Sequence, residues 1–181
     1  ADAHPMDVMR TGVSLLGNLE QETDFAQQDD KVDRILALLP AMVVYWYRFA
    51  QDGIRVSTDT GAETIGGHFL HMLHDKKPSA LHEQVMNVSL ILYAEHEFNA
   101  STFNGRVAAS TLTDIHSVIC GAIGTLRGPL HGGANEAAME MIEQWSSADE
   151  AEVAILKRLE NKELIMGFGH AVYKERDPRN A

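Results

Sequence analysis

The stretch Gly128-Pro129-Leu130-His131-Gly132-Gly133-Ala134-Asn135-Glu136 places a histidine between a proline and two glycines, directly ahead of a helical pattern. Pro129 ends any helix before it, and the apolar residues that follow predict a helix over 134–142. His131 is therefore expected in or just before the first turn, where free N–H groups and the helix dipole disfavour the imidazolium. A neutral histidine there can donate a hydrogen bond to a developing enolate oxygen.

A second stretch of the same kind, Gly167-Phe168-Gly169-His170, follows further along the chain. Glycines beside a histidine allow the backbone to approach a ligand closely. Two such sites in one chain indicate chemistry rather than ordinary turns.

The pattern outside these two stretches predicts helices and no sheet. Gly17 is expected to end the first helix, Pro40 to bend or split the second, and 18–30 to form a polar loop. Residues 164–166 are expected to be briefly extended, but no period-2 alternation is long enough for a sheet. Apolar residues recur at helical spacing over 6–16, 31–51, 64–74, 80–95, 99–109, 115–126, 134–142 and 151–161. The chain is therefore predicted to be all-α.

Two of the predicted helices carry apolar or small residues on more than one side. The helix over 80–95 has two apolar faces, and the one over 115–126 is rich in Gly, Ala, Ser and Cys. Small residues permit close packing of helices. Both helices are expected inside a multi-helix protein or at an interface between two copies.

Composition excludes several classes of protein. Fifteen Lys and Arg against 26 Asp and Glu give a net charge of -11, which argues against a nucleic-acid surface. With 45% apolar residues but no long apolar run and no export signal, a cytoplasmic globular protein without a membrane partner is expected. Cys120, the only cysteine, lies in an apolar setting and is interpreted as a buried small hydrophobe, not a nucleophile.

Three histidines share one face of the helix predicted over 64–74. His68, His71 and His74 follow one another at intervals of three residues, which invites interpretation as a metal site. No Asp, Glu or Cys joins them on that face, so no metal site is predicted. His68 is kept as a candidate ligand-site residue because Gly66 and Gly67 leave room beside it.

The two glycine–histidine stretches, at 128–136 and 167–179, resemble the active-site segments of the citrate synthase family. Three more segments are most similar to its bacterial 2-methylcitrate synthases, namely 4–14, 66–71 and 92–103. The resemblance implies a multi-helical citrate synthase-like fold, with 1–127 as part of the large domain and 128–181 as the start of the small domain. Family members are about twice as long, so an internal fragment is expected.

The resemblance implies a Claisen-type condensation of propionyl-CoA with oxaloacetate, which gives 2-methylcitrate and CoA in propionate catabolism. His131 would donate a hydrogen bond to the thioester oxygen as the enol forms. His170 would polarise the oxaloacetate carbonyl and protonate the growing alkoxide. His96 and Arg179 would bind the oxaloacetate carboxylates, a task for which the guanidinium fork is well shaped.

The resemblance also implies a place for the CoA moiety. The backbone of Gly167, Phe168 and Gly169 would lie near the adenine, and Lys174 and Arg176 would meet the phosphates. Neither a metal nor a cofactor other than the CoA thioester is expected. A homodimer or a larger even oligomer is expected.

Two alternatives stay open. One is citrate synthase proper, which uses acetyl-CoA in the tricarboxylic acid cycle, since one methylene in an apolar pocket changes the free energy by only about 1–3 kcal/mol. The other is a non-catalytic helical dimerisation module. The family's general-base aspartate is expected beyond Ala181 and is not Asp177, so this chain alone is predicted to be inactive.

Overall fold

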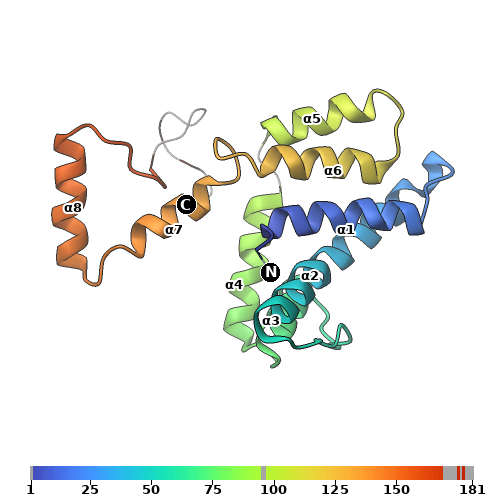
Figure 1. Ribbon diagram of the computed structural model, residues 1–181, viewed down its shortest axis with the longest axis horizontal. Helices are drawn as coiled ribbons and strands as arrows, with labels where there is room; N and C mark the ends of the chain where they lie inside the picture. The colour runs from blue at the N-terminus through green and yellow to red at the C-terminus, as the bar shows by residue number, and fades with distance from the viewer. Residues whose placement is uncertain (1, 95–96, 169–174, 176, 178–181) are drawn as a thin grey trace. The chain divides into compact units, whose positions relative to one another are not determined.

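The computed structural model describes residues 2–94, 97–168, 175 and 177. These residues form helices and turns and contain no strand, which confirms the all-α expectation (Figure 1). The elements are α1 (Pro5–Leu19), the short 3-10 helix η1 (Phe25–Gln27), α2 (Gln28–Asp52), α3 (Ile65–His74), α4 (Ala80–Ala94), α5 (Ala100–Ala109), α6 (Ile115–Leu126), α7 (Ala134–Ile142) and α8 (Ala148–Glu160).

The chain divides into two compact units. The first, Ala1–Thr125, holds α1 to α5 and nearly all of α6, and the second, Leu126–Ala181, holds α7 and α8. The division between Thr125 and Leu126 falls inside the last turn of α6, whereas the boundary expected from the sequence, between 127 and 128, lies just after this helix.

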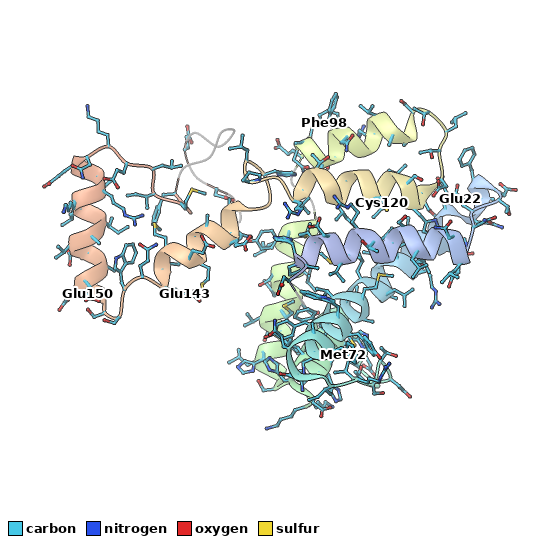
Figure 2. All side chains as sticks on the ribbon, in the orientation of Figure 1. Glu22, Met72, Phe98, Cys120, Glu143 and Glu150 are labelled. Carbon is cyan, nitrogen blue, oxygen red and sulfur yellow. The ribbon has the colours of Figure 1, made fainter. Side chains whose placement is uncertain are left out.

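The first unit has two apolar clusters. Residues of α1, α2 and α6 form one, whose buried members are Val13, Leu16, Ile35 and Ile123. Residues of α2 and α3 form the other, around Ala41, Val44 and the fully buried Met72, which is labelled in Figure 2. Burial of side chains such as Val44 and Met72 stabilises the fold by about 1.5–3 kcal/mol each. The two clusters explain why α2, which belongs to both, is the longest helix described.

The first helix continues through Gly17 to Leu19, so the prediction that it ends at Gly17 is wrong. A Cβ at Gly17 would lie 2.9 Å from the Cβ of His116, at the start of α6. The glycine therefore permits two helices to touch and does not stop one of them.

The predicted loop over 18–30 is shorter than expected, because η1 and the start of α2 occupy its second half. Asp24 caps η1 by accepting a hydrogen bond from the Ala26 amide at 2.9 Å. Asp29 and Asp30 lie in the first turn of α2, where a carboxylate interacts favourably with the helix dipole, and do not cap it.

Three other expectations need correction or refinement. Pro40 lies inside α2 without splitting it, because the apolar clusters on both sides of it hold the helix together. α8 begins earlier than predicted because the Ser147 hydroxyl caps it, accepting from the Glu150 amide at 3.2 Å. Residues 164–166 form no strand but a coil that passes into a turn.

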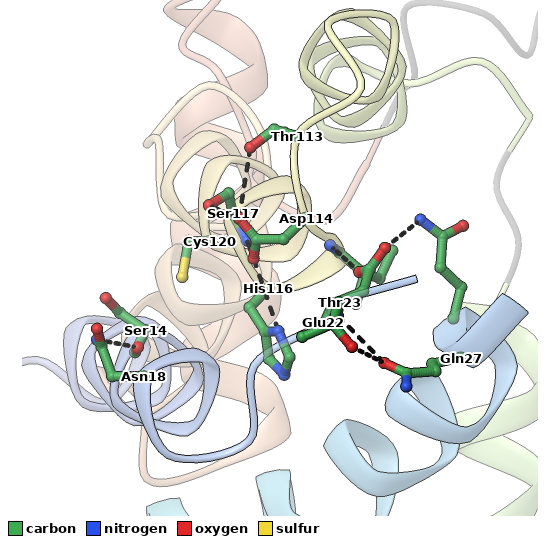
Figure 3. A network of polar contacts seen from close by, with 12 residues as sticks. Ser14, Asn18, Glu22, Thr23, Gln27, Thr113, Asp114, His116, Ser117 and Cys120 are labelled. Atoms are coloured by element: carbon green, nitrogen blue, oxygen red, sulfur yellow. Dashed lines mark hydrogen bonds and ion pairs between the residues drawn. The ribbon is translucent and has the colours of Figure 1, made fainter. Parts of the chain in front are cut away.

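Two carboxylates satisfy amides at the start of α6 (Figure 3). Asp114 accepts from the Ser117 amide at 3.0 Å and from the Ser117 hydroxyl at 2.6 Å. Glu22, far away in sequence, accepts from the Ile115 amide at 2.7 Å. The hydrogen bonds from Ser117 hold the pKa of Asp114 below its usual value, while partial burial opposes them. Asp114 is thus stabilised as a carboxylate.

His116 is buried beside these carboxylates, with 2% of its surface exposed. Its Nδ1 lies 3.6 Å from a carboxylate oxygen of Asp114, which is too long for a hydrogen bond. Cys120, one turn further along α6, is only half-buried, whereas sequence analysis expected full burial. Its Sγ donates to the Arg10 carbonyl at 3.5 Å, and burial raises the pKa of the thiol, which keeps it protonated.

None of the helices in the described part of the chain combines the length and the apolar character needed to cross a bilayer.

Asp114→Ala should lower the free energy of unfolding by about 1 kcal/mol at neutral pH, as loss of an N-cap does. Because folding depresses the pKa of Asp114, its stabilisation is present above the unfolded-state pKa and is lost as pH falls through the folded-state value. Urea unfolding should therefore give variant and wild-type stabilities that converge below about pH 4. Asp33→Ala, at an exposed helical position, serves as control, and a difference between Asp114→Ala and wild type that does not change with pH would contradict the assignment.

Gly17→Ala should destabilise the first unit by about 1–3 kcal/mol, because its Cβ would overlap His116. Gly105→Ala is the matched control, since a Cβ there would meet Val118 at an ordinary 3.6 Å and alanine favours the helix. Thermal unfolding should show a lower midpoint for the first variant only. Equal midpoints for the two variants would mean that Gly17 is not a helix contact.

Candidate active site

A compact turn between α6 and α7 carries His131. The Leu126 carbonyl, at the end of α6, accepts from the Gly132 amide at 2.9 Å, and the Gly128 carbonyl accepts from the His131 amide at 2.9 Å. A Cβ at Gly132 would overlap the Leu126 carbonyl oxygen. The turn therefore requires glycine at 132, and its hydrogen bonds fix the backbone on which His131 is displayed.

His131 lies two residues before Gly133, the N-cap of α7, as the sequence pattern predicted for its place in the chain. Gly133 has no side chain with which to cap the helix, so the turn and the helix follow each other without a side-chain bridge. His131 is half-buried, whereas the neighbouring Leu130 is fully exposed. The imidazole is thus held at the edge of the second unit, next to a side chain that points into solvent.

The second glycine–histidine stretch returns to the same helix. Gly167 has a left-handed backbone, with φ of +89°, and the position of its absent Cβ lies 3.5 Å from the Cβ of Ala138 in α7. Just before it, Ile165 is buried, as is Met141 of α7. Phe168 is largely exposed. Gly167 therefore lies against α7, the helix whose first turn follows His131.

Several predicted site residues lie outside the described residues, so their roles stay predictions. They are His96, Gly169, His170, Lys174, Arg176 and Arg179.

The space expected beside His68 is filled. A Cβ at Gly66 would lie 2.5 Å from the Asn87 Oδ1, and one at Gly67 would lie 2.7 Å from the Glu83 Oε1. Both partners belong to α4, and Asn87 also accepts from the Gly66 amide at 3.0 Å. The glycine pair accommodates α4 rather than a ligand, which corrects the argument for His68.

His68 itself is engaged within the fold. Its Nδ1 lies 2.8 Å from the Thr60 hydroxyl, within hydrogen-bond distance. Across the described ranges, no set of three or more His, Cys, Asp or Glu side chains is arranged to hold a metal ion.

One polar contact at the end of α6 is marked by no local pattern in the sequence. Asn104 of α5 donates to the Gly121 carbonyl at 2.9 Å and to the Thr125 hydroxyl at 2.7 Å, one residue before α6 ends. Its only sequence signal is a polar side chain among the small residues of α5.

Comparison with known proteins covers the whole chain. The family model for the citrate synthase C-terminal domain matches residues 1–181. A 2-methylcitrate synthase of Shewanella oneidensis is 64% identical over 181 residues, which are 100% of this chain and 48% of that protein. Citrate synthase 2 of Bacillus subtilis is 44% identical, over 98% of this chain and 48% of the relative. The chain thus spans about half the length of the curated relatives it matches.

Solved structures share the fold. Citrate synthase from Thermoplasma acidophilum, in a ternary complex with carboxymethyl coenzyme A and oxaloacetate, superposes with a TM-score of 0.81 at 29% identity. The match covers 98% of this chain and 47% of that one. The family model, the relatives and this fold agree along the length of the chain: it belongs to the citrate synthase family.

Proposed function

We propose that this chain is the part of a 2-methylcitrate synthase that carries its two reactive histidines. The observation that supports this substrate is the 64% identity, over the full chain, to a relative named 2-methylcitrate synthase. The citrate synthase of Bacillus subtilis is 44% identical. The reaction is the condensation of propionyl-CoA with oxaloacetate, and the enzyme is placed in the cytoplasm, with no cofactor beyond the thioester.

The proposed chemistry begins at the carbon beside the thioester carbonyl. A base from outside this chain removes a proton from that carbon, and the charge moves to the thioester oxygen. His131 donates a hydrogen bond to this oxygen and thereby stabilises the enolate. The turn supports this role because its backbone hydrogen bonds pre-set the position of the imidazole before substrate binds.

The enolate carbon then attacks the ketone carbon of oxaloacetate. His170 polarises the ketone and gives its proton to the alkoxide, while His96 and Arg179 hold the carboxylates. Water finally cleaves the thioester, which releases CoA and leaves 2-methylcitrate. The contact of Gly167 with α7 supports the pairing of the two histidines, because Gly167 is close to His170 in sequence and lies against the helix that follows His131.

The CoA moiety is assigned to the segment after α8. Gly167, Phe168 and Gly169 would lie against the adenine, and Lys174 and Arg176 would meet the phosphates. The left-handed Gly167 and the exposed ring of Phe168 support a flat, accessible surface for this group.

The reaction can be tested by following release of the CoA thiol from propionyl-CoA and oxaloacetate. The isolated chain should show no turnover, whereas a longer protein that contains it should be active and should have a higher kcat/KM for propionyl-CoA than for acetyl-CoA. In the longer protein, His131→Ala should lower kcat by roughly 10²–10³-fold, the effect of losing a hydrogen-bond donor to an oxyanion. His74→Ala, on an exposed helical histidine of α3, should leave kcat unchanged.

The same assay separates the alternatives. A preference for acetyl-CoA would assign citrate synthase activity instead. If calorimetric titration of the longer protein with oxaloacetate and with CoA gives no binding heat, the chain is a structural module and the enzyme proposal fails.

Two copies of this chain are proposed to associate through α4. This helix contributes no buried residue, and its apolar side chains Leu81, Val85, Ile91 and Tyr93 are each more than half exposed. A second copy would remove this surface from water, which is the dominant favourable term in association.

Sedimentation should therefore give about twice the 20.0 kDa chain mass. Ile91→Lys should produce a monomer that keeps its helical circular dichroism, because a charge cannot be buried unpaired at the contact. Val153→Lys, on an exposed apolar residue of α8, is the control and should remain dimeric. A monodisperse wild-type monomer would rule out the α4 dimer.

A further inference from the structure

Helices α5 and α6 meet through small residues and one polar side chain. A Cβ at Gly105 would be in ordinary contact with the side chains of Val118 and Ala122, at 3.6 and 3.9 Å, so this face of α5 lies against α6. Asn104, next to Gly105, donates hydrogen bonds from its Nδ2 group to α6. Among the described residues, the Asn104 side-chain amide makes two hydrogen bonds from α5 to α6.

The amide of Asn104 binds two groups in the last two turns of α6. Its Nδ2 donates to the Gly121 carbonyl at 2.9 Å and to the Thr125 hydroxyl at 2.7 Å. The Thr125 hydroxyl in turn donates to the Gly121 carbonyl at 2.9 Å. The three groups form a closed hydrogen-bonded triangle that is partly buried, where each such bond is stronger than in water.

The triangle lies immediately before the His131 turn. Thr125 is followed by Leu126, whose carbonyl accepts the Gly132 amide and so closes the turn. Any rotation or fraying of the last turn of α6 moves the Leu126 carbonyl and loosens that hydrogen bond. His131 precedes Gly132, so its position depends on the same carbonyl.

We infer that Asn104 is a positioning residue for His131, acting through the last turn of α6; the inference depends on the proposed function. Asn104 does not touch the reacting atoms. Its hydrogen bonds hold the end of α6, from which the His131 turn starts. Because the turn is bonded to the Leu126 carbonyl, a fixed helix end also fixes the backbone that carries the imidazole.

α5 is suited to this task because it is itself anchored at its start. Asn99 caps α5, with its Oδ1 accepting from the Thr102 amide at 3.0 Å. Asn99 follows closely on His96, the residue proposed to hold the oxaloacetate carboxylate. α5 therefore follows one proposed substrate-binding residue in the sequence, and its Asn104 is hydrogen-bonded to α6, the helix that leads to His131.

The decisive variant is Asn104→Asp, which keeps the shape of the side chain but places an oxygen against the Gly121 carbonyl. Thr125→Val removes the hydroxyl at nearly constant volume, and Thr125→Ser keeps the hydroxyl. Asn18→Asp is the matched control, because the Asn18 Nδ2 donates to the Ser14 carbonyl inside α1 at 2.9 Å.

Hydrogen exchange of the chain tests the structural step. Asn104→Asp and Thr125→Val should each speed exchange of the Gly132 amide roughly tenfold, the loss of about one hydrogen bond, with no change in the amides of α2 and α3. Thr125→Ser and Asn18→Asp should match the wild type at Gly132. Unchanged Gly132 exchange in both disruptive variants would overturn the inference.

Kinetics of the longer protein test the functional step. Asn104→Asp and Thr125→Val should lower kcat by roughly tenfold with KM for oxaloacetate unchanged, and Thr125→Ser should restore kcat. The values of kcat are taken per folded enzyme, because partial unfolding lowers apparent kcat without changing KM. A change in KM for oxaloacetate that parallels the change in kcat, as a disturbed oxaloacetate site would cause, overturns the inference. A wild-type protein that never condenses the substrates overturns the proposed function, whereas an active wild type with an unaffected Asn104→Asp variant overturns only the role of Asn104.

Discussion

The close approach of α1 to α6 at Gly17 is the constraint that sets how α6 packs in the first unit. Because Gly17 has no side chain, the buried ring of His116 fits against α1, and the cluster around Val13 and Ile123 closes beside it. α6 is the helix that leads directly to the His131 turn. The missing side chain of Gly17 thus sets how the first turn of α6 packs within the first unit.

Local signals in the sequence predicted the helices, but they did not predict which structural role each glycine has. Gly17 reads as a helix stop and the pair at 66–67 as open space, yet each accommodates another helix. A glycine permits a turn, a positive φ or a close contact, and only the tertiary partner decides which. The early start of α8 has a different cause, because the Ser147 cap is a local signal that the apolar pattern alone did not include.

Some residues at and before the candidate site could be predicted from local sequence, and others could not. The place of His131 ahead of α7 followed from local chemistry, namely the proline, the glycines and the apolar pattern after them. Glu22 and Asn104 could not be found so, because Glu22 lies 93 residues from its partner Ile115 and Asn104 lies 17 and 21 residues from its two partners. Only the fold brings these groups together, and no periodicity in the sequence marks them.

The full exposure of Leu130 has a consequence for how this turn can diversify. The shape of the turn is encoded by backbone hydrogen bonds and by Gly132, so the side chain at 130 contributes little to holding it. A different residue there would alter what the turn offers to its surroundings while leaving its own geometry intact. Substitutions at position 130 can thus change what this turn binds while the stability of the fold stays almost the same.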